Sequence, residues 1–410
     1  MTYGKKTVIP YRCHHIILTI IMHRKKKLPM LNHMKKKQKI AVLSVSAGSG
    51  HVRAAEAIKA TAEKLCPNFE VVHIDVMDLV PPLFKKVYTE TYIKIVENHP
   101  AFWGYLYHKS DTEKVNSALS KLRVAIERLN TGKLKKVLKE IKPDQVICTH
   151  FLPAQLLSRQ IFEGKFDKPV WVQVTDFDVH GLWIQPNMAG YFAASEEVAW
   201  KMAEKGIKQE NIWVTGIPVM PEFCEPHDRQ ACITEIGLDP DKATLLLMSG
   251  GAGIGNIGAL AERLLKTNER YQVIAVAGKN EQLLETLNQL KVKYDDRLLP
   301  VGFTNSIDKY MAASDLAITK SGGLTTSECL VMGLPMIVAS PIPGQEERNA
   351  DYLLENGAAL KACDQSAVIW RVDMLLYDRK HLDALKQNAL DLARPEAAQK
   401  VLEALAINCM

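Results

Sequence analysis

A glycine turn followed by a glutamate is the segment of this sequence whose residues are best suited to chemistry. Residues 320–328 read Lys-Ser-Gly-Gly-Leu-Thr-Thr-Ser-Glu and lie between an apolar run that predicts a strand and one that predicts a helix. Gly322 and Gly323 would let the backbone approach a ligand closely and would direct free helix N–H groups at an anion. Glu328 falls about one turn into the helix, so its carboxylate can reach back toward Ser321 and the turn. A ribose joined to a diphosphate, as in a nucleotide sugar, fits both groups; a glutamate favoured only by the helix dipole is the alternative.

A second glycine-rich turn follows the strand predicted at 244–249. Its glycines are Gly250, Gly251, Gly253 and Gly255. With Gly258 they match the G-x-G-x-x-G pattern of dinucleotide-binding dehydrogenases. That class needs an acidic residue at the end of the next strand, where this sequence has Ala277-Gly278-Lys279. The turn is therefore predicted to cradle a phosphate of another nucleotide, and no P-loop motif occurs anywhere in the chain.

The first half of the chain offers a candidate base. Gly48 and Gly50 follow a strand predicted at 40–46, and His51 comes next, at the start of a helical pattern. Such a histidine faces the crevice beyond the strand ends, where α/β folds bind ligands. Nearby helix N–H groups disfavour its cation, which suits a general base near neutrality. A histidine that only caps or packs is the alternative.

Two further segments carry polar groups at predicted strand ends. Asp176 and Asp178 match the loose D-x-D motif of metal-using sugar transferases, a motif that arises often by chance, and they lie in the half without the nucleotide-like turns. We therefore expect no metal there, and predict that Asp176 orients His51 or contacts an acceptor hydroxyl. Gln345 and Glu346, at a later helix start, could hydrogen-bond sugar hydroxyls; ordinary helix capping is the alternative.

Strand-like runs alternate with helical patterns from residue 40 to about residue 360. The predicted strands are 40–46, 71–76, 145–149, 170–175, 191–194, 212–215, 244–249, 272–277, 298–301, 316–319, 336–339 and 358–361. Most are apolar throughout, as expected of parallel strands covered on both faces by helices. The chain is also too long for one compact core. We predict an α/β protein with two doubly wound Rossmann-like units that are divided near residues 215–219. A closing helix is predicted near 396–407, without any indication of where it packs.

The net charge of +6 is unevenly distributed. Residues 1–39 hold eleven Lys and Arg and no Asp or Glu, and removing them leaves −5 for the rest, which argues against a nucleic-acid-binding body. We interpret residues 1–39 as a disordered basic arm or as sequence upstream of a natural start at Met30 or Met34, and we favour the second; if expressed, the arm would favour an anionic membrane surface. Eight scattered cysteines without a C-x-x-C pair indicate reduced thiols in a cytosolic protein.

Taken together, the polar segments resemble the glycosyltransferases that attach sugars to diacylglycerol. This family comprises the plant monogalactosyldiacylglycerol synthases and the bacterial processive diacylglycerol glucosyltransferases; the GlcNAc transferase of peptidoglycan synthesis is a more distant relative. The likeness runs from about residue 37 to the C-terminus. It rests on residues 48–51, 174–177, 215–219, 320–323 with Glu328, and 343–346. It implies a GT-B fold, in which two Rossmann-like domains face a central cleft: residues 40–216 for the acceptor, 217–394 for the UDP-sugar, and a closing helix within 395–410.

The resemblance also implies roles for individual residues. Residues 250–255 and 321–323 would hold the diphosphate, and Phe303 would lie against uracil, largely through backbone contacts. Glu328 would hold the ribose, Gln345 and Glu346 the hexose, and His51 would be the base candidate. Two departures are that relatives often carry proline where Ser321 stands, and that Asp178 is not a family feature.

The implied reaction moves glucose or galactose from UDP-glucose or UDP-galactose to diacylglycerol with inversion. It needs no cofactor and no metal, and it takes place on the cytoplasmic face of the membrane by a peripheral enzyme. There are three alternatives. The same fold could act on a peptidoglycan lipid intermediate or another polyprenyl lipid, the protein could be a UDP-sugar epimerase, or it could be a UDP-sugar sensor without turnover.

Residues 81–109 are dense in aromatic and cationic side chains. Trp and Tyr favour the headgroup layer and Lys favours anionic lipid, so the segment is predicted to dock on a membrane. A pair of helices packed on the core is the alternative.

Overall fold

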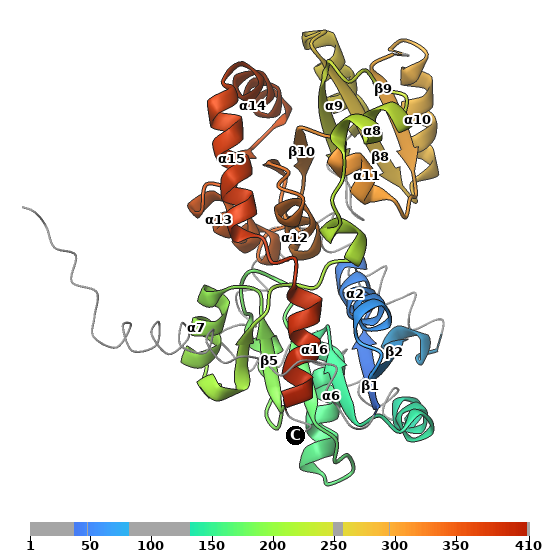
Figure 1. Ribbon diagram of the computed structural model, residues 1–410, viewed down its shortest axis with the longest axis vertical. Helices are drawn as coiled ribbons and strands as arrows, with labels where there is room; N and C mark the ends of the chain where they lie inside the picture. The colour runs from blue at the N-terminus through green and yellow to red at the C-terminus, as the bar shows by residue number, and fades with distance from the viewer. Residues whose placement is uncertain (1–36, 47, 82–131, 249–256, 295, 408–410) are drawn as a thin grey trace, which may run out of the picture.

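The computed structural model describes residues 37–46, 48–81, 132–248, 257–294 and 296–407. Within them the chain forms two lobes, one above the other in Figure 1, and each lobe is built on a six-stranded parallel sheet with flanking helices. The α/β class and the two Rossmann-like units predicted from the sequence are confirmed. The predicted docking segment beyond residue 81 and the four glycines at 250–255 lie outside the described residues.

The first lobe carries the sheet with the order β2-β1-β3-β4-β5-β6. Its strands are β1 (Gln38–Ser44), β2 (Phe69–Asp75), β3 (Gln145–Cys148), β4 (Val170–Gln173), β5 (Gly190–Ala193) and β6 (Ile212–Val214). Its helices include α2 (Ser49–Leu65), α6 (Phe151–Phe162) and α7 (Glu196–Glu204), and residues 132–141 are helical as well. The first strand begins at Gln38, so the last residues of the predicted basic extension belong to the sheet. The reason is pairing, because Gln38 and Lys39 continue the parallel register with Phe69 and Glu70.

The second lobe carries the sheet with the order β12-β11-β10-β7-β8-β9. Its strands are β7 (Ala243–Met248), β8 (Tyr271–Gly278), β9 (Leu298–Gly302), β10 (Leu316–Thr319), β11 (Met336–Ala339) and β12 (Ala359–Ala362). Its helices are α8 (Arg229–Glu235), α9 (Ile257–Thr267), α10 (Glu281–Lys291), α11 (Ile307–Ala312), α12 (Gly323–Val331), α13 (Gln345–Glu355), α14 (Gln365–Tyr377) and α15 (Arg379–Leu392). Every strand predicted from the sequence is present, with ends shifted by a few residues.

The strand orders explain where the polar turns meet. In each sheet the order reverses beside the first strand, between β1 and β3 and between β7 and β10. Loops that leave such a reversal point diverge and open a crevice at the carboxyl ends of the strands. The glycine turns before α2 and before α12 leave from these two points, so the topology brings the two predicted sites to facing edges.

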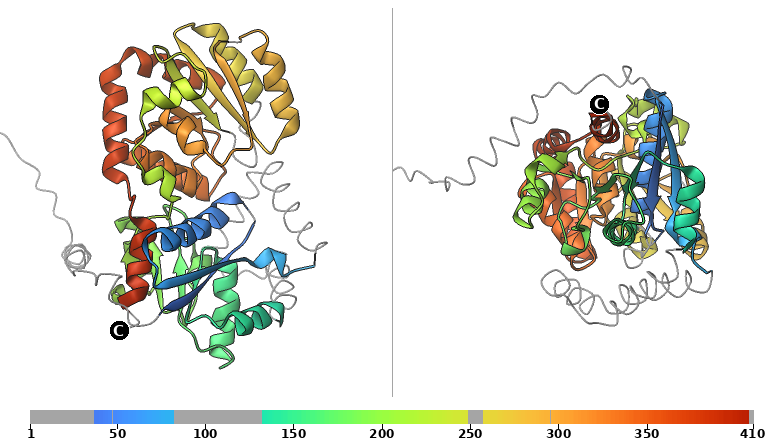
Figure 2. Two further views of the ribbon diagram at one scale, coloured as in Figure 1. Left: turned by 45° about the vertical axis from the view of Figure 1, so that its right-hand side comes forward. Right: turned by 90° about the horizontal axis from the view of Figure 1, so that it is seen from below.

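The closing helix, α16 (Ala397–Ile407), returns to the first lobe after the chain has built the second. It packs beside α2 and covers one face of the first sheet, as Figure 1 and Figure 2 show. Val401, Leu402 and Leu405 join the core formed by Ile40 and Val42. The side-chain amide of Gln145 in β3 also donates to the carbonyl of Leu405 (3.2 Å). The return of the chain to the first lobe through α16 therefore ties the two lobes together.

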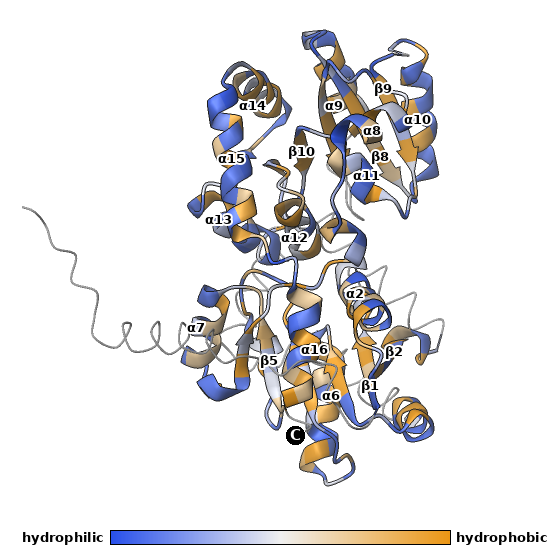
Figure 3. Cartoon of the chain, viewed as in Figure 1, coloured by the Kyte–Doolittle hydropathy of each residue, from blue (hydrophilic) through white to orange (hydrophobic). Residues whose placement is uncertain are grey.

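The cores follow the hydropathy pattern. In Figure 3 the strands are largely orange and α15 is largely blue. One apolar cluster continues across the lobe boundary. It includes Phe177 after β4, Ile217 after β6, and Leu324 and Leu330 from α12. Among the described residues, no helix combines the length and apolarity needed to cross a bilayer.

Candidate active site at the domain interface

The two glycine turns face each other across the lobe interface. Gly48 precedes α2 with a φ of 114°, a conformation that favours glycine, and no atom of the described residues would lie within 4 Å of a β-carbon added there. Behind it, a β-carbon added at Gly50 would lie 3.6 Å from the β-carbon of Leu324 in α12. The first turns of α2 and α12 are thus in contact.

The predicted phosphate turn serves the domain contact as well. A β-carbon at Gly323 would lie 2.0 Å from the carbonyl oxygen of Thr175, so only glycine permits the two backbones to approach this closely. The sequence pattern predicts that a ligand approaches this glycine, whereas the atom that approaches it belongs to the other lobe. Among the described residues, only the Oε1 of Glu346 lies near a β-carbon added at Gly322, at 4.0 Å.

His51 lies in the first turn of α2 with its imidazole oriented by the first lobe. Its Nδ1 is 2.9 Å from the carbonyl oxygen of Thr149 and 2.9 Å from the hydroxyl oxygen of Thr175. Because a carbonyl only accepts, Nδ1 carries the proton and Nε2 keeps its lone pair. Burial lowers the pKa of His51 to about 4, so the ring is neutral. The neutral ring agrees with the sequence-based prediction, but its main cause is burial and not the nearby helix N–H groups.

A second histidine was not identified from the sequence. His150 follows β3, and its ring meets that of His51 edge to face, with 4.6 Å between the centroids. Its Nδ1 accepts from the backbone N–H of Leu152, and burial holds its pKa well below the usual value. Trp183 completes an aromatic wall, 6.0 Å from His51. The signal for His150 was its place directly after a predicted strand, at the same edge as His51.

Asp176 does not orient His51, which corrects one of the two predicted roles. Thr149 and Thr175 take that role, and the Asp176 Oδ1 instead accepts from the Asn349 side-chain amide (3.2 Å), across the lobe boundary. Burial raises the pKa of Asp176 to about 6, and the charges of Glu346 and Asp178 add to the rise, whereas the Asn349 hydrogen bond opposes it. Asp176 thus remains a candidate for contact with the acceptor.

The two aspartates of the D-x-D pattern have separate partners. The Asp178 carboxylate pairs with Lys201 (3.0 Å) and with Arg348 of α13. No group of three His, Cys, Asp or Glu side chains placed to hold a metal is found in the described part of the chain.

Glu328 is buried where α12 meets α2. Burial raises its pKa to about 8, against the opposing charge of Arg53 and with a smaller contribution from Glu222. A carboxyl group with this pKa is protonated near neutrality and can both donate and accept a hydrogen bond. This is the hydrogen-bonding capacity that a pair of vicinal hydroxyls requires.

The residues predicted to bind the hexose lie beside the glycine turn. Gln345 begins α13, and the Ser321 hydroxyl donates to the backbone carbonyl of Glu346 (2.6 Å). The Glu346 Oε2 accepts from the Ile342 N–H (2.7 Å), which precedes the helix, while its Oε1 faces Gly322. The helix is capped by Glu347, whose Oε2 accepts from the Gly344 N–H (3.1 Å). Burial also raises the pKa of Glu346. The structure therefore brings the Ser321 turn and the start of α13 into one cluster.

Phe303 is exposed at the carboxyl end of β9. Its side chain is 64% exposed, and the ammonium nitrogen of Lys279 lies 5.1 Å from the centroid of its ring. An exposed aromatic face beside a cation is a platform for a base and its phosphates. Lys279 was the residue that argued against a dehydrogenase, and its contact with Phe303 was not predicted.

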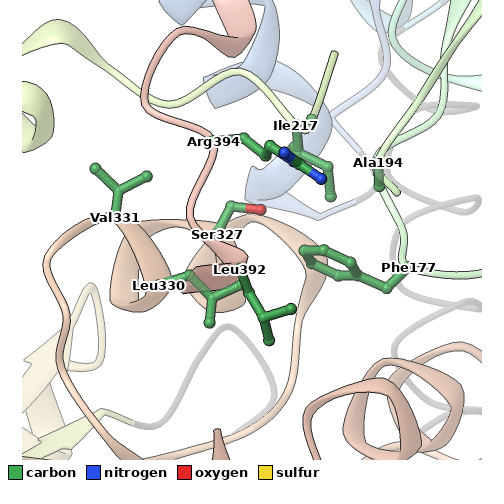
Figure 4. Close-up of a pocket in the computed structure, with 9 residues that line it drawn as sticks. Phe177, Ala194, Ile217, Ser327, Leu330, Val331, Leu392 and Arg394 are labelled. Carbon is green, nitrogen blue, oxygen red and sulfur yellow. The ribbon is translucent and has the colours of Figure 1, made fainter. Parts of the chain in front are cut away.

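Two hollows lie away from the glycine turns. Figure 4 shows the smaller one, of about 10 Å³, with Phe177, Ser327 and Arg394 around it; this is room for about one water. The larger one, of about 490 Å³, lies beside the chain crossing between Phe223 and Arg229 and is bounded by α15. Neither includes the Ser321 turn or His51.

Comparison with known proteins identifies the family. The model of the Monogalactosyldiacylglycerol (MGDG) synthase family matches residues 51–219, and that of the Glycosyltransferase family 28 C-terminal domain matches residues 248–402. The processive diacylglycerol beta-glucosyltransferase of Bacillus subtilis (strain 168) is 29% identical over 375 residues, 90% of this chain and 95% of that protein. That of Bacillus mycoides (strain KBAB4) is 30% identical over 381 residues, 91% and 94%.

Solved structures show the same fold. S. aureus MnaA bound to UDP gives a TM-score of 0.61 at 14% identity, covering 91% of this chain and 98% of that one. Acinetobacter baumannii MurG gives 0.56 at 17% identity, covering 90% and 99%. At these identities the likeness concerns the fold alone, and it agrees with the predicted GT-B architecture. The length and identity of the sequence matches go further: the chain belongs to the family of the diacylglycerol glycosyltransferases.

Proposed function

We propose that this protein transfers a hexose from UDP-glucose or UDP-galactose to the free hydroxyl of diacylglycerol and inverts the anomeric configuration. The observation that carries the proposal is the orientation of His51, whose Nε2 lone pair is unprotonated and whose Nδ1–H is held by Thr149. The relatives that match along nine-tenths of the chain bear the name of diacylglycerol beta-glucosyltransferases. Both facts support the transfer of a sugar to a lipid hydroxyl.

The second lobe would hold the donor. Phe303 offers a face for uracil, and the Glu328 carboxyl can bond the ribose hydroxyls as donor and acceptor. Glu346, whose Oε1 lies near Gly322, and Gln345, which begins the same helix, would contact the hexose. The N–H groups at the start of α12, with the glycine turn at 250–255, would stabilise the charge that grows on the departing UDP, so a metal need not do so.

In the reaction, the hydroxyl oxygen of diacylglycerol attacks the anomeric carbon of the hexose. Its proton passes to the Nε2 of His51, the new C–O bond forms, and the bond to the diphosphate breaks with its electron pair leaving on UDP. Asp176, with a pKa of about 6, is the second candidate base. The close contact of the lobes at Gly323 would keep water from the donor and limit hydrolysis.

The acceptor resides in a bilayer, so the enzyme must work at a membrane surface. We propose peripheral attachment, with an anionic surface as the favoured partner of the aromatic segment 81–109 and, if it is expressed, of the basic arm that precedes β1. Free cysteines, several of them buried, fit a reducing compartment and hence the cytoplasmic face.

The test uses purified protein with vesicles that contain diacylglycerol and an anionic lipid. Radiolabelled UDP-glucose and UDP-galactose are supplied separately, and the products are separated by thin-layer chromatography. We expect a labelled β-glycosyl diacylglycerol from one donor or from both. Binding of UDP-sugar without any product would instead favour a sensor, and product only with a polyprenyl lipid would favour another acceptor.

A further inference from the structure

One buried amide joins the two lobes beside the reacting groups. Asn349 in α13 is fully buried, and its Nδ2 donates to the Ser321 carbonyl (3.0 Å) and to the Asp176 Oδ1 (3.2 Å). Its Oδ1 accepts from the backbone N–H of Phe177 (2.7 Å). The side chain of Asn349 thus uses both its donors and its acceptor in one bridge between the donor turn and the loop after β4.

Neighbours of Asn349 on α13 also contact the loop after β4. Arg348 pairs with Asp178, and the ring of Tyr352 stacks on that of Phe177, with 4.6 Å between centroids and 17° between planes. The first turn of this helix carries Gln345 and Glu346. One rigid helix therefore bears both the residues proposed to contact the hexose and those that hold the acceptor-side loop.

The loop after β4 leads directly to the proposed base. Thr175, whose hydroxyl lies 2.9 Å from the Nδ1 of His51, is the residue before Asp176. Three consecutive residues of the loop thus contact His51, the Asn349 amide nitrogen and the Asn349 carbonyl oxygen in turn. A shift of the loop relative to α13 would move both candidate bases relative to the donor sugar.

We infer that Asn349 is a positioning residue, which sets Asp176 and, through Thr175, His51 at the reacting distance from the donor hexose. The inference rests on the proposed function. It requires an amide at this position, because only an amide offers two donors to Asp176 and Ser321 and an acceptor to Phe177. Aspartate has the same shape and keeps the acceptor, but it loses both donors and puts a second carboxylate beside Asp176.

The protonation of Asp176 gives this role a signature that packing alone lacks. The groups that act on Asp176 are Glu346 from α13 and Asp178 from its own loop, which raise its pKa, and Asn349, which lowers it. Lys201 and Arg348 neutralise Asp178. Loss of the Asn349 donors should therefore raise the pKa of Asp176 and move the acid side of the pH–rate profile to higher pH.

The experiment compares Asn349→Asp and Asn349→Ala with Asn356→Ala as control. Asn356 follows α13, and its exposed side chain bonds only the carbonyl of Tyr352 among the contacts of the described chain. We expect kcat to fall about 100-fold in Asn349→Asp, because a small misplacement has this effect. KM for the UDP-hexose should change far less. The apparent pKa of the acid limb in the pH profile of kcat should rise by roughly half to one pH unit, which is the effect of one hydrogen bond. Asn356→Ala should match the unaltered protein.

The inference is overturned if folded Asn349→Asp keeps the wild-type kcat and acid limb. It is equally overturned if kcat falls in both variants while the acid limb stays in place, because that pattern belongs to a purely structural residue. Melting temperatures measured on all variants establish which of them are folded.

A measurement on the unaltered protein covers the case in which the variants do not fold. Hydrogen exchange followed by mass spectrometry should show a protected Phe177 amide in the absence of substrate, and exchange at the rate of an exposed loop would overturn the bridge. This measurement needs no turnover. An enzyme that makes no glycolipid but shows a protected Phe177 would refute the proposed function and keep the bridge.

Discussion

His51 in the first lobe and Glu328 in the second are comparable, since each is a buried titratable group in the first turns of a helix at the interface. Burial moves their pKa values in opposite directions, to about 4 for the imidazole and to about 8 for the carboxyl. Both are therefore neutral at pH 7. The first lobe presents a lone pair and the second presents a proton donor, and neither of these two groups carries a charge.

The lobes also differ in how many contacts their candidate site residues make with neighbouring residues. In the first lobe the imidazole has its orienting partners, Thr149 and Thr175. In the second lobe Phe303 remains exposed, and among the described residues only the Oε1 of Glu346 lies near a β-carbon added at Gly322. Under the proposed function, the first lobe would hold a preorganised base and the second would offer its exposed groups to the nucleotide.

The largest expected effect comes from removing the base. His51→Ala and His51→Gln should lower kcat by about 10² to 10⁴-fold, because general-base assistance is lost. UDP affinity, measured by calorimetry, should change little, since the nucleotide groups belong to the other lobe. His381→Ala, in the distant α15, serves as the control. A loss of UDP binding with unchanged kcat would reverse the assignment of the two lobes.

The two glycines of the donor turn should respond differently to one methyl group. In Gly323→Ala the added carbon would collide with the Thr175 carbonyl, so the lobes must separate, at a stability cost of roughly 1–3 kcal/mol. Gly322→Ala should leave stability unchanged, because the nearest atom of the described residues is 4.0 Å away. Urea unfolding of the two variants measures the difference. Equal stabilities would contradict the direct contact between the lobes.

A substitution at Phe303 should affect UDP binding without affecting the stability of the fold. Phe303→Ala should weaken UDP binding by about 1–3 kcal/mol, the usual contribution of a base stacked on an aromatic ring. Its melting temperature should remain that of the unaltered protein, because the ring is 64% exposed. Phe162→Ala, on an exposed ring at the end of α6, is a matched control for both measurements. Unchanged UDP affinity in Phe303→Ala would place the uracil elsewhere.

The smallest expected effect is on stability as a function of pH. The raised pKa of Glu328 gives a contribution that is fully present below about pH 4.5 and is lost as the pH rises to about 8. The lowered pKa of His51 gives the opposite slope, with stability lost as the pH falls from about 6.5 to 4. Glu328→Gln should therefore remove a decline of at most about 1.4 kcal/mol per pH unit. Urea unfolding from pH 6.5 to 8.5 isolates it, and parallel curves for the two proteins would refute the buried neutral carboxyl.

Much of the architecture follows from local patterns. The apolar runs located the strands of both sheets, as at Leu316–Thr319 and Met336–Ala339, because buried parallel strands have no polar face. The glycine turns marked the crevice, because the strands' carboxyl ends share an edge. The role of Asp176 was predicted less well, since its partner Asn349 is 173 residues away in the sequence. No periodicity or motif reports such a pair.

By itself, the sequence determined the alternation of strands and helices, the positions of the polar turns and the family, because these depend on the order of residue types along the chain. Only the tertiary structure decided which ring nitrogen of His51 is free, that Gly323 meets Thr175, and that α16 packs on the first lobe. It also decided that burial neutralises Glu328. The physical reason is that hydrogen-bond partners and desolvation are set by the packing of distant segments, which a local pattern does not contain.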